Sequence, residues 1–273
     1  MGVVGSPMLS EALQRPKRKG VSMLASGIAE LQRPGSIHIC YGQEDGQLRQ
    51  VDGLLSRAEI SRGEQLIHRS DRFGYLTLHA AMRLRTAEYL GVPPSSVQIG
   101  KLPCPCCGDI RHGPPAILSP RTDLRITATR SSGSWAFAVA IGFPIGLDME
   151  RFSEDLNTDR VASAAMSEEE LQFFHSSRAS QRTALFYRCW TRKEAILKAI
   201  GIGLAIPLPE ITVASTSESG AVMTVDLGDA PTSWAVEDFT PFPLSYMALA
   251  SPAAISTSVS FVALNPDLSV GGG

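Results

Sequence analysis

The amino-acid sequence predicts an α+β protein made of two similar subdomains packed together. In each half of the chain, segments with helical periodicity come before a run of short segments typical of strands. That order favours helices packed against antiparallel sheets over a regular alternation of strands and helices. The chain has 273 residues, 44% of them hydrophobic, which suffices for one large domain or two of about 100–150 residues each.

We place the boundary between the two subdomains at Asp148. Residues 36–147 form the expected N-terminal subdomain, and residues 148–264 form the C-terminal one. Residues 1–35 mix Pro, Gly and Ser with a basic run and show no sustained periodicity, whereas residues 265–273 end in a run of Gly. Both ends are therefore predicted to be disordered or flexible.

The elements of the N-terminal half can be predicted in order. SIHIC at 36–40 alternates as a strand does, and residues 56–90 form a helical stretch that begins at a capping serine and ends at Gly91. LRITATR at 124–130 and SWAFAVAIG at 134–142 are typical of two paired strands, the second fully buried.

In the C-terminal half, two helices precede the strands. Ser167 can cap one helix, with Glu170 at the capping-box position, and a second helix runs through about 180–200 and stops at Gly201. Five short strands are predicted to follow, with the sequences ITVAST, AVMTVDL, SWAVEDF, YMALASP and SVSFVAL.

Composition and charge indicate an ordinary globular protein. The net charge of −2 gives no global reason to expect a nucleic-acid partner. The longest apolar run, at 135–147, is shorter than the roughly 20 residues of a membrane span and contains Pro144, so no membrane partner is expected. The first twenty residues lack the apolar core of a secretory signal, which makes the cytoplasm the expected location.

Arginine is concentrated between residues 57 and 85, where the sequence holds six arginines and three acidic residues. A local basic patch of this kind can hold phosphates or an acidic partner. The same residues can also form an ordinary solvated helix face, and the composition alone leaves both interpretations open.

The five cysteines include three in the segment CPCCGDIRHG. Cys104 and Cys107 have the spacing of half a zinc site, and His112 can add a third ligand. No second pair with this spacing follows, so a tight loop with packed thiols is the alternative.

Two acidic segments indicate a site for a hard cation. Asp148 and Glu150 lie two residues apart after the buried apolar run, so they point to the same side of a strand, whereas Met149 points to the other. Carboxylates without a histidine or cysteine companion suit Mg²⁺ better than zinc. Carboxylates at the end of a strand are also common in ordinary loops.

The predicted helix near 185–200 carries the other half of this site. Trp190, Glu194 and Lys198 lie within one strip of its surface, opposite the apolar face. Taken alone, Glu194 and Lys198 favour a surface ion pair of a few tenths of a kcal/mol. An indole on the polar face favours a groove or an interface instead.

In combination, these segments resemble the 4′-phosphopantetheinyl transferases of the Sfp type, in the holo-acyl-carrier-protein synthase superfamily. The pattern is G-x-D-x-E followed some forty residues later by W-x-x-K-E-x-x-x-K-x-x-G-x-G-L. The matching residues are Gly146, Asp148, Glu150, Trp190, Lys193, Glu194, Lys198, Gly201, Gly203 and Leu204. Looser similarity extends over most of residues 36–262.

The resemblance implies a fold of two similar subdomains in a pseudo-twofold monomer, and it implies a reaction. Members transfer the phosphopantetheine arm of coenzyme A to a serine of an apo acyl or peptidyl carrier protein and release adenosine 3′,5′-bisphosphate. The length of the chain suits members that serve polyketide or nonribosomal peptide synthesis as well as fatty-acid synthesis.

The resemblance also implies roles for individual residues. Asp148, Glu150 and Glu194 would hold Mg²⁺, and Lys198 would contact the transferred phosphate. Glu194, or a water beside it, would take the serine proton. The expected coenzyme A contacts are Arg69, Arg72, Gly113, Thr129 and Arg130, together with Asp148 and Lys198.

The sequence departs from the family pattern on the coenzyme side. Pro114 stands where a basic residue is usual, and Thr129 stands where a serine is usual. Two alternatives therefore stay open: an inactive module that binds coenzyme A or a nucleotide, and an interaction protein stapled by zinc at Cys104, Cys107 and His112.

Overall fold

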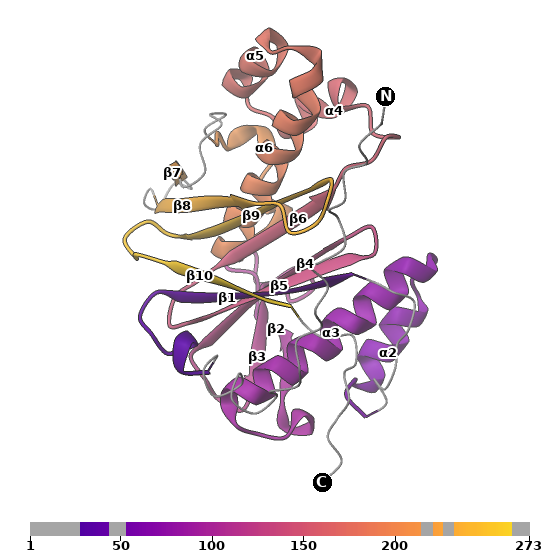
Figure 1. Ribbon diagram of the computed structural model, residues 1–273, viewed down its shortest axis with the longest axis vertical. Coiled ribbons are helices and arrows are strands. Elements are labelled where there is room, and N and C mark those ends of the chain that lie inside the picture. Colours follow the sequence, from indigo (N-terminus) through magenta and orange to yellow (C-terminus); the bar gives the residue numbers. More distant parts are fainter. Residues whose placement is uncertain (1–27, 44–52, 214–220, 226–231, 264–273) are drawn as a thin grey trace, which may run out of the picture.

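The fold consists of two four-stranded sheets with helices packed against them, as seen in a computed structural model (Figure 1). The structure describes residues 28–43, 53–213, 221–225 and 232–263. The strand order is β10-β1-β5-β4 in one sheet and β6-β9-β8-β7 in the other, with β2 and β3 as a separate pair. The predicted α+β class is confirmed, whereas the pseudo-twofold relation of the subdomains stays a prediction.

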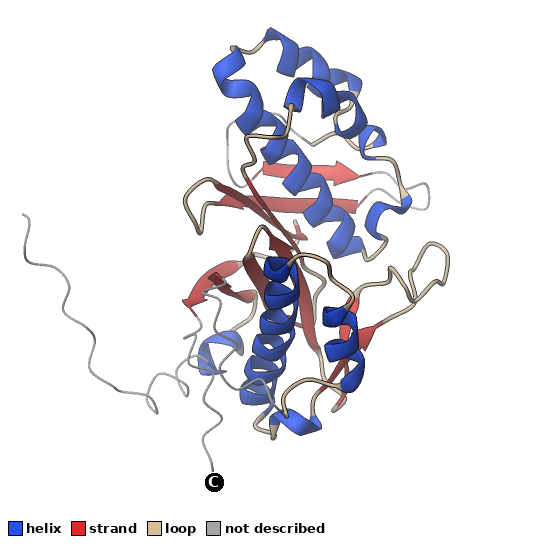
Figure 2. Ribbon diagram, turned by 90° about the vertical axis from the view of Figure 1, so that its right-hand side faces the viewer, coloured by secondary structure: helices blue, strands red, loops and turns tan. Residues whose placement is uncertain are grey.

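The N-terminal elements are β1 (Ser36–Gln43), α2 (Arg57–Glu64), α3 (Arg69–Leu90), β2 (Gln98–Lys101), β3 (Pro115–Ser119), β4 (Leu124–Ser131) and β5 (Ser134–Ile141). A 3₁₀ turn spans Pro94–Ser96. The predicted strand near 36–40 and the predicted strand pair are confirmed, since β4 and β5 form an antiparallel pair that turns at Ser131 and Ser134. In Figure 2, α2 and α3 lie on one side of the lower sheet.

The C-terminal elements are β6 (Gly146–Arg151), α4 (Thr158–Ala165), α5 (Glu168–Ser176), α6 (Ala179–Ile200), β7 (Ala221–Val225), β8 (Thr232–Phe239), β9 (Ser245–Pro252) and β10 (Ser258–Ala263). Two 3₁₀ turns span Gly203–Ala205 and Leu208–Glu210. The predicted capping box of α5 is present, because Ser167 Oγ accepts from the Glu170 N–H and Glu170 accepts from the Ser167 N–H. Gly201 ends α6 with a φ of 88°, as its position predicted.

Three segments differ from the sequence-based expectations. The helical stretch 56–90 is two helices, α2 and α3, separated by residues 65–68, where Ile67 is almost fully exposed. Residues 211–213 of the predicted strand ITVAST are not a strand, and its remainder lies outside the described residues. Of the predicted N-terminal extension, residues 1–27 also lie outside them, but residues 28–31 form a helical turn with Leu31 buried. The predicted tail, 265–273, is likewise outside the described residues.

The last strand joins the first sheet, which the sequence-based boundaries did not anticipate. β10 pairs in parallel with β1, with Ser36 opposite Ser258 and Tyr41 opposite Ala263. The first and last strands that the structure describes therefore lie in the same sheet, and β10 covers an edge of β1 that would otherwise be open. In the part of the chain that the structure describes, no helix is long and apolar enough to cross a membrane.

The two sheets meet at β4 and β6, and side-chain hydroxyls join them. Thr127, Thr129 and Ser131 lie at alternate positions of β4, so their side chains share one face. Their hydroxyl oxygens accept hydrogen bonds from successive alternate N–H groups of β6, those of Leu147, Met149 and Arg151. These bonds take the place of a backbone ladder at this junction, and they fix the position of β6 relative to β4.

Candidate active site

The predicted acidic residues and Lys198 converge at the junction of the two sheets. Asp148 and Glu150 lie on β6, and Glu194 and Lys198 lie on α6, which packs across β6. All four line one open pocket, together with Thr129 and Arg130 of β4 and Trp190 of α6. The sequence argument that placed these side chains on one side of a strand and one strip of a helix therefore agrees with the geometry.

Two small details of packing put α6 in this position. A Cβ atom on Gly146 would lie 1.8 Å from the carbonyl oxygen of Ala195, so the helix can approach the strand only where glycine stands. Met149 is fully buried in the apolar cluster between the sheets, as the strand alternation predicted. Asp148 and Glu150 therefore point toward α6.

Asp148 is the most enclosed of the four residues, with 4% of its surface exposed. Its Oδ1 accepts a hydrogen bond from Lys198 Nζ at 2.7 Å and another from Thr129 Oγ1 at 3.2 Å. Lys198 Nζ also donates to the carbonyl oxygen of Leu147. The second carboxylate oxygen of Asp148, Oδ2, is buried and has no hydrogen-bond partner. An unpartnered buried carboxylate oxygen calls for a cation or a donor from outside the chain.

The electrostatics of the site also favour a bound cation. Burial, followed by repulsion from Asp148 and Glu150, raises the pKa of Glu194 to about 7, although Lys198 opposes the shift. Burial and the charge of Asp148 also raise the pKa of Glu150, which accepts a 2.6 Å hydrogen bond from Ser131 Oγ. Three carboxyl groups thus share one ammonium group, and the site favours an additional positive charge.

The residues present fit Mg²⁺. The carboxylates do not bring three ligand atoms within 4.8 Å of one another, but Mg²⁺ usually keeps several waters and takes only one or two carboxylates directly. The donors are all oxygen atoms, and Asp148 Oδ2 is free to bind. The fit rests on this donor set and on the raised pKa values of Glu150 and Glu194.

On the N-terminal side, the pocket carries basic residues that can meet phosphates. Arg130, a predicted contact, donates to the carbonyl oxygen of Asp71 at 3.0 Å and lies over the ring of Tyr75. Arg62 of α2 and Lys101 of β2 also line the pocket, although the sequence did not single them out. Arg62 lay within the arginine-rich stretch, whereas Lys101 gave no signal in the sequence.

A second groove continues from this pocket, because both are lined by Tyr75, His79, Glu194 and Lys198. Gly113, another predicted contact, lines the second groove, as do Gly201 and Gly203 from the turn that follows α6. Together the two form one open channel between α3 and α6. Glu194 and Lys198 lie where its two parts meet, and Asp148 and Glu150 line the first part only.

Two predicted contacts do not line this channel. Arg69 lies over the ring of Phe73 at 5.1 Å, at the start of α3. Arg72 is exposed and lies 3.8 Å from Glu64. The structure therefore places Arg62 and Lys101, and not Arg69 or Arg72, beside the acidic residues.

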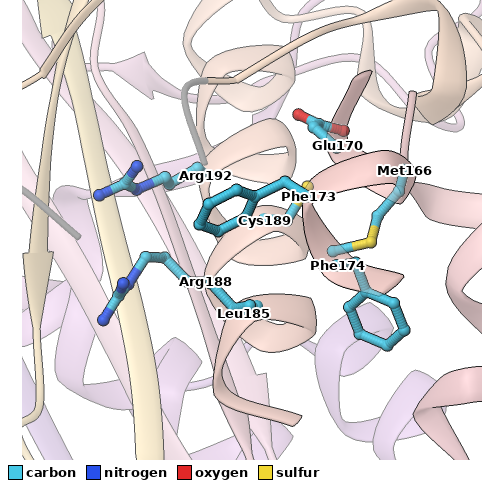
Figure 3. Close-up of a pocket in the computed structure, with 8 residues that line it drawn as sticks. All are labelled: Met166, Glu170, Phe173, Phe174, Leu185, Arg188, Cys189 and Arg192. Carbon is cyan, nitrogen blue, oxygen red and sulfur yellow. The ribbon is translucent and has the colours of Figure 1, made fainter. Parts of the chain in front are cut away.

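Lys193, the other lysine of the helix motif, lies in the core. Its fully buried ammonium group lies 2.5 Å from Glu170 and donates to the carbonyl oxygens of Ala165 and Leu208. Figure 3 shows Glu170 beside Cys189 in a small pocket on the face of α6 that also carries Arg188 and Arg192. Neither Lys193 nor Glu170 lines the channel, and the pair that they form is buried, so we assign both residues to the stability of the fold.

The fold and the site agree with the comparison of this chain with known proteins. A family model described as the 4′-phosphopantetheinyl transferase superfamily matches residues 144–254, which include β6, α6 and β9. The matched segment contains Asp148, Glu150, Glu194 and Lys198. The resemblance to this superfamily that the sequence motifs predicted is confirmed, and curated relatives of the chain are named 4′-phosphopantetheinyl transferases.

Individual relatives carry the same name. The chain is 27% identical over 202 residues to the 4′-phosphopantetheinyl transferase HetI of a Nostoc species, covering 73% of this chain and 79% of HetI. It is 27% identical over 173 residues to the 4′-phosphopantetheinyl transferase Sfp of Bacillus subtilis, and the match covers 63% of this chain and 60% of Sfp. A Synechocystis relative with a provisional name of the same kind is 28% identical over 159 residues, and the chain spans 61% of its length.

Proposed function

We propose that this protein transfers the 4′-phosphopantetheine arm of coenzyme A to a serine hydroxyl of an apo acyl or peptidyl carrier protein. The serine oxygen would form a bond to the phosphorus of the pantetheine phosphate, the anhydride P–O bond would break, and adenosine 3′,5′-bisphosphate would leave. The observation that carries the proposal is the convergence of Asp148, Glu150, Glu194 and Lys198 in one pocket that basic side chains also line.

Phosphoryl transfer depends mainly on positioning and on neutralising charge that develops on the phosphate oxygens. Asp148, Glu150 and Glu194 would hold Mg²⁺, which when bound supplies positive charge to the pyrophosphate. Lys198, held near the site by its ion pair with Asp148, would donate to the phosphate oxygens as their charge grows.

Glu194 is the group best suited to accept the serine proton. A carboxyl group with a pKa of about 7 can exist as the base and also hold a proton near neutral pH. Its side chain lines both parts of the channel, so a serine entering from one side can meet coenzyme A entering from the other.

Arginine and lysine side chains on the N-terminal side would bind the phosphates of coenzyme A. Arg130 suits the pyrophosphate because its guanidinium group forms paired hydrogen bonds with phosphate oxygens. Arg62 and Lys101 would supply the positive charge that Pro114 lacks. Arg69 and Arg72 at the start of α3 stay predicted contacts of the 3′-phosphate, at the edge of the site.

Thr129 has a different role from the predicted coenzyme contact. Its hydroxyl accepts from the N–H of Met149 and donates to Asp148, so its hydrogen atom is already engaged. We propose that Thr129 positions Asp148. Because residues of a single chain line the whole pocket, we also propose that the protein acts as a monomer.

Intact-mass spectrometry of several apo carrier proteins, incubated with coenzyme A, Mg²⁺ and this protein, tests the proposal. We expect the carrier to gain the mass of phosphopantetheine and expect Asp148→Asn to abolish the gain. Glu154→Gln, a change of an exposed acid away from the channel, is the matched control and should retain activity. Binding of coenzyme A without any gain on any carrier would instead support an inactive binding module.

Carriers from fatty-acid, polyketide and nonribosomal peptide synthesis should be compared in that experiment. Carrier proteins of this kind are acidic, so the arginine-rich stretch 57–85 can attract them as well as bind phosphates. A gain on one class of carrier and not on another would identify the pathway. The cytoplasmic location stays a prediction.

A further inference from the structure

The loop between β2 and β3 carries a second group of potential metal ligands, separate from the acidic site. The sulfur atoms of Cys104 and Cys107 and a ring nitrogen of His112 all lie within 4.8 Å of one another. Cys107 Sγ lies 3.1 Å from His112 Nε2. Among the described residues, this is the group of three that meets that distance.

The spacing of the three atoms can be compared with the geometry of bound zinc. Zinc–sulfur bonds of about 2.3 Å in a tetrahedron place two ligand atoms roughly 3.8 Å apart. The ligand atoms lie up to 4.8 Å apart, so they would have to move by about 1 Å to bind one ion. Rotation of the exposed side chains of Cys107 and His112 can supply this movement. Thiolate and imidazole ligands favour zinc over Mg²⁺ or Ca²⁺.

We propose that Cys104, Cys107 and His112 bind a zinc ion that closes this loop, with water as the fourth ligand. The backbone of the loop already holds the two cysteines close together. The N–H of Gly108 donates to the carbonyl oxygen of Cys104 at 2.8 Å, and Gly108 has a φ of 74°, a conformation that glycine adopts without strain. This turn brings the two cysteines of the C-x2-C pair to the same side.

The base of the loop is also closed, which returns His112 to the cysteines. The N–H of Leu102 donates to the carbonyl oxygen of Pro114 at 2.9 Å. A Cβ atom on Gly113 would lie 1.7 Å from the carbonyl oxygen of Leu102, so this close approach requires glycine. Lys101 Nζ also donates to the carbonyl oxygen of Arg111. The chain from 102 to 114 thus forms a closed loop, with the three ligands on it.

The location of the loop suggests what the zinc ion does. Cys104 is 2% exposed and packs in the apolar cluster of the C-terminal half, together with Ile202. Pro114 packs against Gly201, and the same loop contributes His112 and Gly113 to the channel. Zinc would therefore hold a segment of the N-terminal half against the turn after α6. We assign it a structural role and no part in the transfer reaction.

Metal analysis of the full chain, purified under reducing conditions and dialysed against zinc and then against buffer, tests the proposal. We expect stoichiometric zinc in the wild-type protein. Cys107→Ser and His112→Ala should each weaken zinc binding at least tenfold in competition with a chromogenic chelator. Cys106→Ser is the matched control, because Cys106 is exposed in the same loop but is not one of the three ligands. It should retain full zinc content.

Co²⁺ provides a second readout, which can be made first on the wild-type protein alone. Co²⁺ added to the zinc-free wild-type protein should give the charge-transfer absorption of a cobalt–thiolate bond, and Cys107→Ser should reduce it. Absence of zinc and of this absorption in the wild-type protein would overturn the proposal, as would an equal loss in Cys106→Ser. A Cys104–Cys107 disulfide that persists under the reducing conditions of the purification would also overturn it. None of these readouts depends on transferase activity.

Discussion

Replacing Glu194 with glutamine should stabilise the metal-free protein above neutral pH. The carboxyl group of Glu194 has a pKa of about 7 in the folded chain against an ordinary value of 4.5, because it is buried close to Asp148 and Glu150. Between these two pH values the folded state keeps a proton that the unfolded chain has lost. The free energy of unfolding therefore falls as the pH rises through this window and levels off above it.

The size of the effect follows from the shift. One pKa unit corresponds to about 1.4 kcal/mol, so a shift of roughly 2.5 units costs the folded state about 3 kcal/mol at pH 8. Glutamine has nearly the same shape and never ionises, so the Glu194→Gln variant avoids this cost. For a chain of this size, about 3 kcal/mol corresponds to a rise in Tm of roughly 6–12 °C.

Urea denaturation with a chelator present, followed at several pH values between 4 and 8.5, measures the difference directly. We expect the two proteins to unfold at the same urea concentration near pH 4 and to diverge as the pH rises. Glu154→Gln, which changes an exposed acid, should follow the wild-type curve throughout. Parallel curves for the wild-type and Glu194→Gln proteins at all pH values would refute the proposed repulsion, as would a variant that is less stable at pH 8.

Three further changes test other parts of the structure. Lys193→Met should destabilise the protein by about 3–5 kcal/mol in urea denaturation, because it leaves Glu170 buried without its cation, and unchanged stability would contradict that role. Asp148→Asn should lower Mg²⁺ affinity at least tenfold by calorimetry, and an unaltered affinity would remove Asp148 from the ligand set. Gly113→Ala should weaken coenzyme A binding at least tenfold, because its Cβ would collide with the carbonyl oxygen of Leu102; equal affinity would show that the loop adjusts freely.

Local chemistry made much of the fold predictable. The starts of α2 and α5 follow from the capping serines Ser56 and Ser167, and in the structure both serines form capping boxes. The end of α6 follows from Gly201, which adopts the left-handed conformation. In each case the residue that sets the helix end lies within one turn of that end, so the end can be predicted without knowledge of tertiary contacts.

Features that depend on distant contacts were not predictable from the sequence. Nothing in the segment Ser258–Ala263 indicates that it pairs with β1 and not with the strands before it. The break between α2 and α3 at residues 65–68 carries no glycine or proline, and the long helical pattern continues through it. Lys101 joins the candidate site only because the β2–β3 pair brings it to the pocket that Thr129 and Arg130 also line.

The helix motif W-x-x-K-E-x-x-x-K shows why a pattern of residues cannot assign roles by itself. Lys193 and Lys198 are both lysines of one motif on one helix, yet the side chain of Lys193 is fully buried and that of Lys198 is 27% exposed. Helical geometry separates them, since five residues along an α-helix turn a side chain by about 500°, which leaves the two roughly 140° apart. One lysine therefore neutralises Glu170 in the core, and the other faces the channel.

The contacts of Thr129 explain why this position can depart from the family pattern. Its hydroxyl links the N–H of Met149 to the carboxylate of Asp148, and the hydroxyls of Thr127 and Ser131 accept the neighbouring N–H groups of β6. A hydroxyl at this position of β4 is thus required by the junction between the sheets, and threonine and serine both supply one. The substitution at position 129 therefore leaves the acidic side of the site intact, and only Pro114 removes a positive charge from the coenzyme side.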